Sequence, residues 1–154
     1  MQELREFAKK KSFECMVKSK AYKNWLKTLQ PANLILVVGA ALLSLIAGSS
    51  LLIEQKILDK HVAGIMALLS AGFTIVHNKF NCDQHQAECS KLKSQYEALA
   101  LSYADLELID QENVFKLKIS ELNSEFSQLV KNSTAEPSEK AIKKAEKSLS
   151  LIHI

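Results

Sequence analysis

The sequence contains few of the residues that break helices. Its 154 residues include four glycines and two prolines, and neither proline interrupts an apolar run. Aromatic residues make up only 6% of the chain, although hydrophobic residues make up 47%. Because Gly and Pro are the strongest local signals for turns, their scarcity predicts an all-α fold built from long helices.

Charge is absent from one long stretch. No Asp, Glu, Lys or Arg occurs between Thr28 and Ile53, and residues 33–53 would span roughly the 30 Å of bilayer hydrocarbon at helical rise. A buried soluble helix is a poor alternative, because the run has no polar face. A signal peptide is excluded by the charged 30 residues that precede a core longer than signal peptides use.

A second uncharged segment, residues 61–78, lies between Lys60 and Lys79. It is shorter, so either its flanks approach the headgroups or the bilayer thins. The connector of residues 54–60 is too short to hold a domain. Residues 31–78 therefore predict a hairpin of two antiparallel transmembrane helices, with the lipid bilayer as the first partner.

The basic residues predict the orientation of this hairpin. Residues 1–30 contain one Arg and seven Lys against three Glu, and such an excess marks the cytoplasmic side. We therefore expect a multi-pass protein of the cell inner membrane with both termini in the cytoplasm. The net charge of +3 then describes a basic collar at the inner leaflet and not an affinity for nucleic acid.

The N-terminal segment, residues 1–30, predicts a basic amphipathic helix. Its apolar residues follow a 3.6-residue period. Two environments fit this face, which could lie among the lipid headgroups or pack on the C-terminal helices. The residues of the stripe are Leu4, Phe7, Ala8, Cys15, Tyr22, Leu26 and Leu29.

Small residues repeat every four positions in both spans, and such stripes let membrane helices approach closely. They could close the hairpin on itself or join neighbouring chains into a homo-oligomer. Hydroxyls at Ser70 and Thr74 share a face with His77, which fits either pore lining or ordinary helix packing. The two stripes are Ala40, Ser44 and Gly48 in the first span, and Ala63, Ala67 and Ala71 in the second.

Residues 79–131 predict a long cytoplasmic helical or coiled-coil region. Two rows of apolar residues, here called seams, run along this region. In the first the spacing alternates between four and three residues, and in the second it is seven. The apolar face changes phase between them near residues 110–113, which predicts a bend or a break. The partner helix for these seams could belong to the same chain or to a neighbouring subunit. The first seam is Leu92, Tyr96, Leu99, Tyr103 and Leu106; the second is Leu101, Leu108, Phe115, Leu122 and Leu129, joined by Ile119 and Phe126.

Residues 132–154 predict a linker and a short amphipathic C-terminal helix. Ser133 or Ser138 could cap this helix. Its apolar stripe could dock on the other helices or rest on the membrane, and it could also be loosely ordered. The stripe is Ala141, Ile142, Ala145, Leu149 and Ile152.

Motifs for chemistry are scarce. Cys82, His85 and Cys89 are the one arrangement with metal-ligand spacing, but a structural zinc site needs four protein ligands, so a metal is not the default. The three cysteines give no disulfide framework. We find no phosphate-binding loop, catalytic triad or paired-carboxylate motif, and predict neither enzymatic activity nor a cofactor.

The order of elements resembles the SLATT domain family, over roughly residues 5–130. The similarity lies in a basic helix with Tyr and Trp, a span beginning PANLILVVG at Pro31, a second span with IMALLSA from Ile65, and a helix with YEAL from Tyr96. The resemblance implies a two-helix, pore-forming membrane effector of bacterial nucleotide-signalled defence systems. No fused sensor domain is evident, so the trigger would come from a cytoplasmic protein, a nucleotide-signalling partner or an unidentified ligand surface.

Two functional classes follow. The first is an oligomeric membrane effector, pore-forming or membrane-depolarising, in a bacterial defence or conflict system. The alternative is a membrane-anchored scaffold whose cytoplasmic helices recruit a protein partner. A third reading, an effector that a pathogen delivers into host membranes, also fits the residues.

Overall fold

The computed structural model describes residues 1–52 and 59–150. Most of the predicted connector, Ile53 at the end of the first span and Ile152 of the C-terminal stripe lie outside the described residues. The described chain is all-α, as predicted, and contains no strand in these two ranges. Its elements are α1 (Gln2–Leu52), α2 (Lys60–Lys79), α3 (Cys82–Asp105), the 3-10 helix η1 (Leu106–Leu108), α4 (Glu112–Asn132) and α5 (Glu139–Ser150).

The chain divides into two compact units, to which α1 and α3 both contribute. The hairpin unit is Lys27–Gln86, and the bundle unit combines Met1–Leu26 with Ala87–Ile154. Helix α1 continues through Pro31. The predicted boundary between the N-terminal segment, residues 1–30, and the hairpin, residues 31–78, is therefore not a break in the helix. Proline removes one backbone N–H donor from α1 without ending it.

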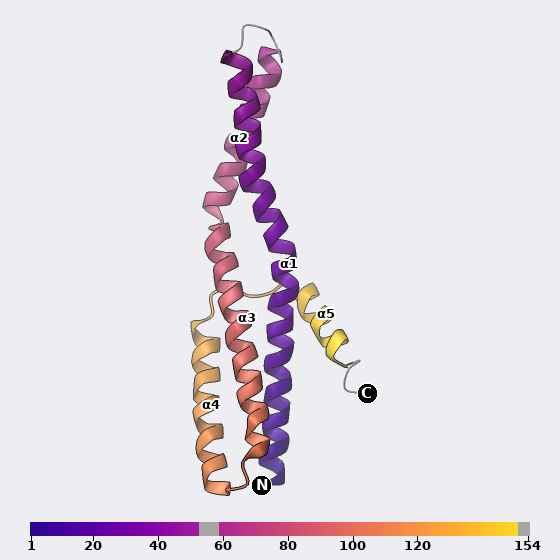
Figure 1. Cartoon of the computed structure of the whole chain (residues 1–154), viewed down its shortest axis with the longest axis vertical. Helices are drawn as coiled ribbons and strands as arrows, with labels where there is room; N and C mark the ends of the chain where they lie inside the picture. The colour runs from indigo at the N-terminus through magenta and orange to yellow at the C-terminus, as the bar shows by residue number, and fades with distance from the viewer. Residues whose placement is uncertain (53–58, 151–154) are drawn as a thin grey trace. The chain divides into compact units, whose positions relative to one another are not determined.

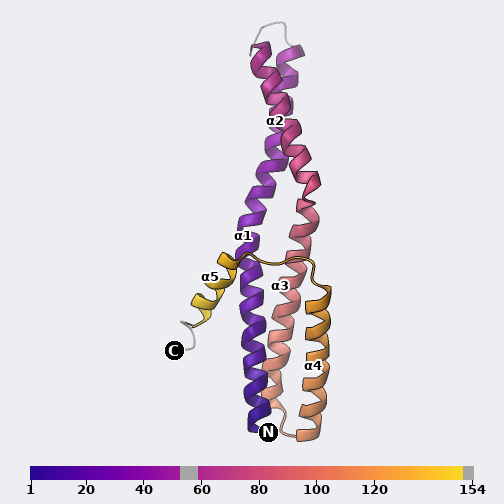
Figure 2. The same cartoon turned by 180° about the vertical axis from the view of Figure 1, so that it is seen from behind.

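In the bundle unit, α3 lies side by side with both α1 and α4 (Figures 1 and 2). The first predicted seam forms its core: Leu92, Tyr96, Leu99, Tyr103 and Leu106 are all buried. The Tyr96 ring contacts the rings of Tyr22 in α1 and Phe126 in α4, and Tyr103 Oη donates to Asn123 of α4 at 2.8 Å. The partner helices therefore come from the same chain.

The N-terminal stripe also faces this core. Ala8, Cys15, Tyr22 and Leu26 are buried, whereas Phe7 stays exposed. The Tyr22 ring stacks on Tyr96 of α3 with 5.8 Å between ring centroids. Of the two environments that the sequence left open, the structure has the stripe packed on the C-terminal helices.

Two buried hydroxyls tie α1 to distant backbone. Ser12 Oγ donates to the carbonyl of Ala100 at 2.7 Å, and Tyr22 Oη donates to the carbonyl of Ala135 at 2.7 Å. The second bond fixes the linker between α4 and α5 against α1. Burial raises the pKa of Tyr22, so this hydroxyl stays a donor across the physiological pH range.

Replacing Tyr22 by Phe is expected to lower the free energy of unfolding by about 1–2 kcal/mol, because the buried Ala135 carbonyl loses its partner. Thermal unfolding of the purified chain in detergent measures the effect. Phe13→Leu, at an exposed ring of the same helix, is the control and should change little. An unchanged melting temperature in Tyr22→Phe would show that the hydrogen bond does not hold the linker.

The predicted break occurs where α3 ends, because η1 and residues 109–111 separate α3 from α4. Phe115 and Ile119 of the second seam are buried, and Leu122, Phe126 and Leu129 are partly buried. Leu101 and Leu108 are 60% and 83% exposed, so the prediction that they continue this seam was wrong. The seven-residue repeat assumes one continuous helix, and the turn at η1 resets its phase.

Helix α5 docks on the bundle. Ser138 starts it, since its Oγ accepts from the backbone N–H of Ala141 at 3.3 Å, as an N-cap should. The apolar face of α5 then forms a small core with α1, made of Val17, Ala21, Ala145, Leu149 and Ile142.

Candidate functional site

The hairpin unit presents its apolar side chains outward. In Figures 1 and 2, α2 runs beside the C-terminal part of α1, and both helices are long and apolar enough to cross a membrane. Only 11% of the most apolar window of each helix is buried; Ile35, Leu45 and Leu68 are 64%, 68% and 74% exposed. The core helix of a soluble protein would be mostly buried, so these faces fit an apolar solvent.

A short polar network joins the two helices of the hairpin. Ser70 of α2, which is 5% exposed, donates its hydroxyl to the carbonyl of Ala40 in α1 at 2.8 Å. A hydroxyl has one proton, so in the 2.6 Å contact between the Ser44 and Ser70 oxygens Ser44 is the donor. Interhelical bonds of this kind contribute about 0.6 kcal/mol each in membrane proteins.

Small side chains set the spacing of the hairpin. Ala40 and Ala63 from the predicted stripes are buried in it, together with Ala47, which the four-residue spacing missed. At Gly39, an added Cβ would lie 3.3 Å from the Phe73 ring, so this glycine permits a close approach. Ala47 follows Ala40 by seven residues, and a heptad count would have found it.

Most of the other predicted small and hydroxyl residues gather along one groove of about 660 Å³ on the hairpin. Ala67 and Ala71 are exposed in it. Apart from the adjacent residues and nearby backbone of the same helix, no atom of the described residues lies within 4 Å of a Cβ added at Gly48 or Gly64. The described residues of the hairpin thus leave this groove open. It is lined by Ser44, Ala47, Gly48, Lys60, Ala63, Gly64, Ala67, Ser70, Ala71, Thr74 and Ile75.

The predicted hydroxyl face is only partly continuous. Thr74 donates to the backbone carbonyl of Ser70 at 3.0 Å, whereas the His77 Nε2 atom lies 3.4 Å from an Asp83 carboxylate oxygen. Asn33 of α1 donates to the other Asp83 oxygen at 2.6 Å. This Asn33 bond and, next, His77 lower the pKa of Asp83 below its ordinary value of 3.8.

Replacing Asn33 by Ala is expected to raise the pKa of Asp83 towards 3.8, because the largest cause of the lowered value is removed. The contact stabilises the hairpin unit above the unfolded pKa and is lost as pH falls through the lower folded pKa. A ¹³C NMR titration of the Asp83 carboxyl in micelles measures this. Gln86→Ala is the control, and an equal shift in both variants would contradict the assignment.

The three residues with metal-ligand spacing do not form a site. Residues 1–52 and 59–150 contain no group of three His, Cys, Asp or Glu side chains that could hold a metal ion. Cys89 is buried in the bundle unit. Cys82 and His85 belong to the hairpin unit and are partly exposed. The spacing predicted three ligands on one helix, but the three residues are divided between the two units.

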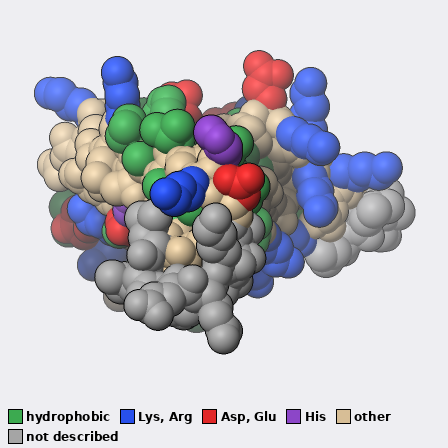
Figure 3. Space-filling model, turned by 90° about the horizontal axis from the view of Figure 1, so that it is seen from above, with side chains coloured by type: hydrophobic (Ala, Val, Ile, Leu, Met, Phe, Trp, Pro, Cys, Tyr) green, Lys and Arg blue, Asp and Glu red, His purple; other side chains and the backbone are tan. Residues whose placement is uncertain are grey.

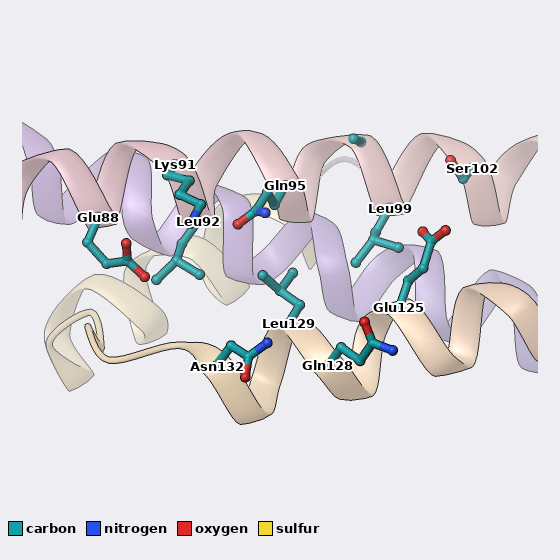
Figure 4. A pocket seen from close by; sticks show the side chains of 11 residues that line it. Glu88, Lys91, Leu92, Gln95, Leu99, Ser102, Glu125, Gln128, Leu129 and Asn132 are labelled. Carbon is teal, nitrogen blue, oxygen red and sulfur yellow. The ribbon is translucent and has the colours of Figure 1, made fainter.

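The bundle unit carries a separate groove of about 380 Å³ between α3 and α4. Figure 4 shows Leu92, Leu99 and Leu129 between the two helices, with polar side chains around them. An apolar floor with a polar rim is the arrangement of many protein-binding surfaces. The rim consists of Glu88, Lys91, Gln95, Ser102, Glu125, Gln128 and Asn132.

Comparisons of the chain with protein-family models, with curated proteins and with solved structures found no match.

Proposed function

We propose that this chain is an oligomeric membrane effector of a bacterial defence or conflict system, whose hairpin unit spans the inner membrane and depolarises it. The observation that carries the proposal is the exposed apolar hairpin with an open groove of small residues. The resemblance of its sequence to SLATT domains supports the effector role.

Oligomerisation follows from the physics of helix contacts in lipid. No hydrophobic effect drives helices together there, so association depends on close packing and hydrogen bonds. The groove exposes Ala67 and Ala71 on α2 beside Gly48 on α1, where a helix of a neighbouring chain can approach the backbone. Ala63 and Ser70 are buried in the hairpin seam at one edge of the groove, whereas Ala67 and Ala71 stay exposed for a neighbouring helix.

Permeation would use the hydroxyls of the same surface. Ser44, Ser70 and Thr74 line the groove together with its small residues. A ring of hairpins that brings these hydroxyls together would give water a polar path across the hydrocarbon. Lys60 is the one charged residue of the groove, and neither residues 28–53 nor residues 61–78 contain Asp, Glu, Lys or Arg. The uncharged part of the path would select weakly between ions.

The orientation places both termini in the cytoplasm, because the basic N-terminal residues favour that side. The bundle unit then meets the cytoplasm, where a triggering protein or signal would reach it. In the alternative scaffold function, the groove between α3 and α4 would bind that partner, and the hairpin would only anchor it. The apolar floor of this groove favours keeping the scaffold as a second candidate.

Expression from an inducible promoter in a bacterium, followed with a voltage-sensitive dye, tests the effector proposal. We expect the membrane potential to fall before growth stops. Purified protein in liposomes loaded with potassium should also release the ion. Inserted protein that neither lowers the potential nor releases potassium would contradict pore formation.

The scaffold is tested at the rim of its groove. Leu99 is 6% exposed, so a charge there would unfold the bundle and would not discriminate between the two functions. Gln95→Arg with Gln128→Arg changes the rim while sparing the core. Depolarisation that survives this double variant favours the effector. A chain that never depolarises the membrane, and that loses partner recruitment in this variant, favours the scaffold.

A further inference from the structure

We propose that the outward face of α5 binds anionic lipid headgroups of the cytoplasmic leaflet. This inference deepens the proposed function: it requires membrane insertion but not pore formation. Four lysines lie at spacings of three, four and seven residues along α5, so they share one face of the helix. They are Lys140, Lys143, Lys144 and Lys147, and all four are exposed.

The apolar face of α5 is already occupied. Ala141, Ala145 and Leu149 are buried, and the last two pack with Val17 and Ala21 of α1. The helix therefore cannot insert this face into lipid as a free amphipathic helix would. Docking turns the lysines outward and holds them on a fixed surface.

These lysines are not neutralised by the chain. None of the four forms an ion pair with another residue in the described ranges, whereas Lys116 and Lys118 of α4 pair with Glu112 and Glu121. Figure 3 shows Lys and Arg side chains gathered on the side where Figure 1 places α5. An unpaired basic face of this kind attracts anions.

The start of α5 contacts α1 at a residue that lies shortly before the predicted first span in sequence. Asn24 of α1 donates to the carbonyl of Ala141 at 3.5 Å, and Asn33 begins the predicted span nine residues later. The segment of α1 on which α5 docks is therefore covalently joined, within the same helix, to the segment that would enter the membrane.

Several charges act together on this face of α5. Each basic residue near an anionic leaflet strengthens binding about fivefold. Removal of three of the four lysines should therefore weaken binding far more than removal of one.

Hydrogen exchange of the full-length chain in lipid nanodiscs tests the proposal. We expect the α5 amides to exchange about tenfold more slowly in discs with one-third phosphatidylglycerol than in pure phosphatidylcholine discs. This protection should disappear in 1 M salt, where screening shortens to about 3 Å. It should also disappear in the triple variant Lys140→Gln, Lys143→Gln, Lys144→Gln.

Lys116→Gln, Lys118→Gln, Lys131→Gln on α4 is the charge-matched control and should keep the protection. Equal exchange in the two kinds of disc, or equal loss in both triple variants, would overturn the inference. Protection of α5 by a DNA duplex in phosphatidylcholine discs would reassign the face to nucleic acid and overturn it as well. A chain that enters neither disc would instead contradict the membrane assignment itself.

Discussion

Replacement of Ala67 by Leu is expected to abolish membrane depolarisation while leaving the chain folded and inserted. Ala67 is exposed within the hairpin groove, so we expect the larger side chain to occupy the groove and leave the buried hairpin seam intact. In an oligomer it would keep the neighbouring helix from approaching. Overpacking of a close contact costs about 1–3 kcal/mol, which corresponds to a loss of assembly of about 5- to 150-fold.

The voltage-dye assay with membrane fractionation measures this effect, and cross-linking in the membrane reports assembly. Leu68→Phe is the matched control, because Leu68 is 74% exposed and does not line the groove. It should depolarise like the original chain. Full depolarisation by Ala67→Leu would show that the groove is not the contact between chains.

The bundle core is expected to respond most strongly to Phe115→Ala. The Phe115 side chain is fully buried, and truncation of a buried Phe costs about 3–5 kcal/mol because a cavity remains. Chemical denaturation of the purified chain in micelles measures the loss. Leu108→Ala is the control: Leu108 is 83% exposed, and its truncation should change stability by less than about 0.5 kcal/mol.

If Leu108→Ala were as destabilising as Phe115→Ala, the seven-residue seam expected from sequence would be correct and the break at η1 would not exist. The comparison thus tests the point at which the structure departs most clearly from the sequence pattern.

Helix positions could be predicted well where hydrophobic periodicity is regular. The uncharged run ending at Asn78 matches α2, and the seam from Leu92 to Leu106 is buried as its spacing indicates. Periodicity identifies which face of a helix is covered, because the helix repeat is fixed. It could not identify the covering element. The stacking of Tyr22 on Tyr96 depends on tertiary contacts between distant segments.

The candidate site was only partly predictable. The repeat of small residues every four positions identified Ser44, Ala67 and Ala71, which the hairpin brings into one groove. It missed Ala47 and the close approach at Gly39, since the crossing of two helices depends on both surfaces together. It also could not foresee that His77 lies beside Asp83, because Asp83 belongs to the next helix.

Two native thiols interfere little with labelling experiments. Burial is the main cause that raises the pKa of Cys15 to about 11, and it also raises the pKa of Cys89. At neutral pH both are therefore almost entirely protonated, and a thiol reacts with maleimides as its thiolate. Cys82 is partly exposed and would be replaced by Ser.

Labelling with a membrane-impermeant maleimide then tests the central claim, that residues 31–78 cross the inner membrane twice. A cysteine replacing Asp59, the N-cap of α2, should react in intact spheroplasts. A cysteine replacing Glu121 on α4 should react only after the membrane is permeabilised. Equal reaction of both cysteines in intact spheroplasts would contradict the hairpin, whereas reaction of the Glu121 variant alone would contradict its orientation.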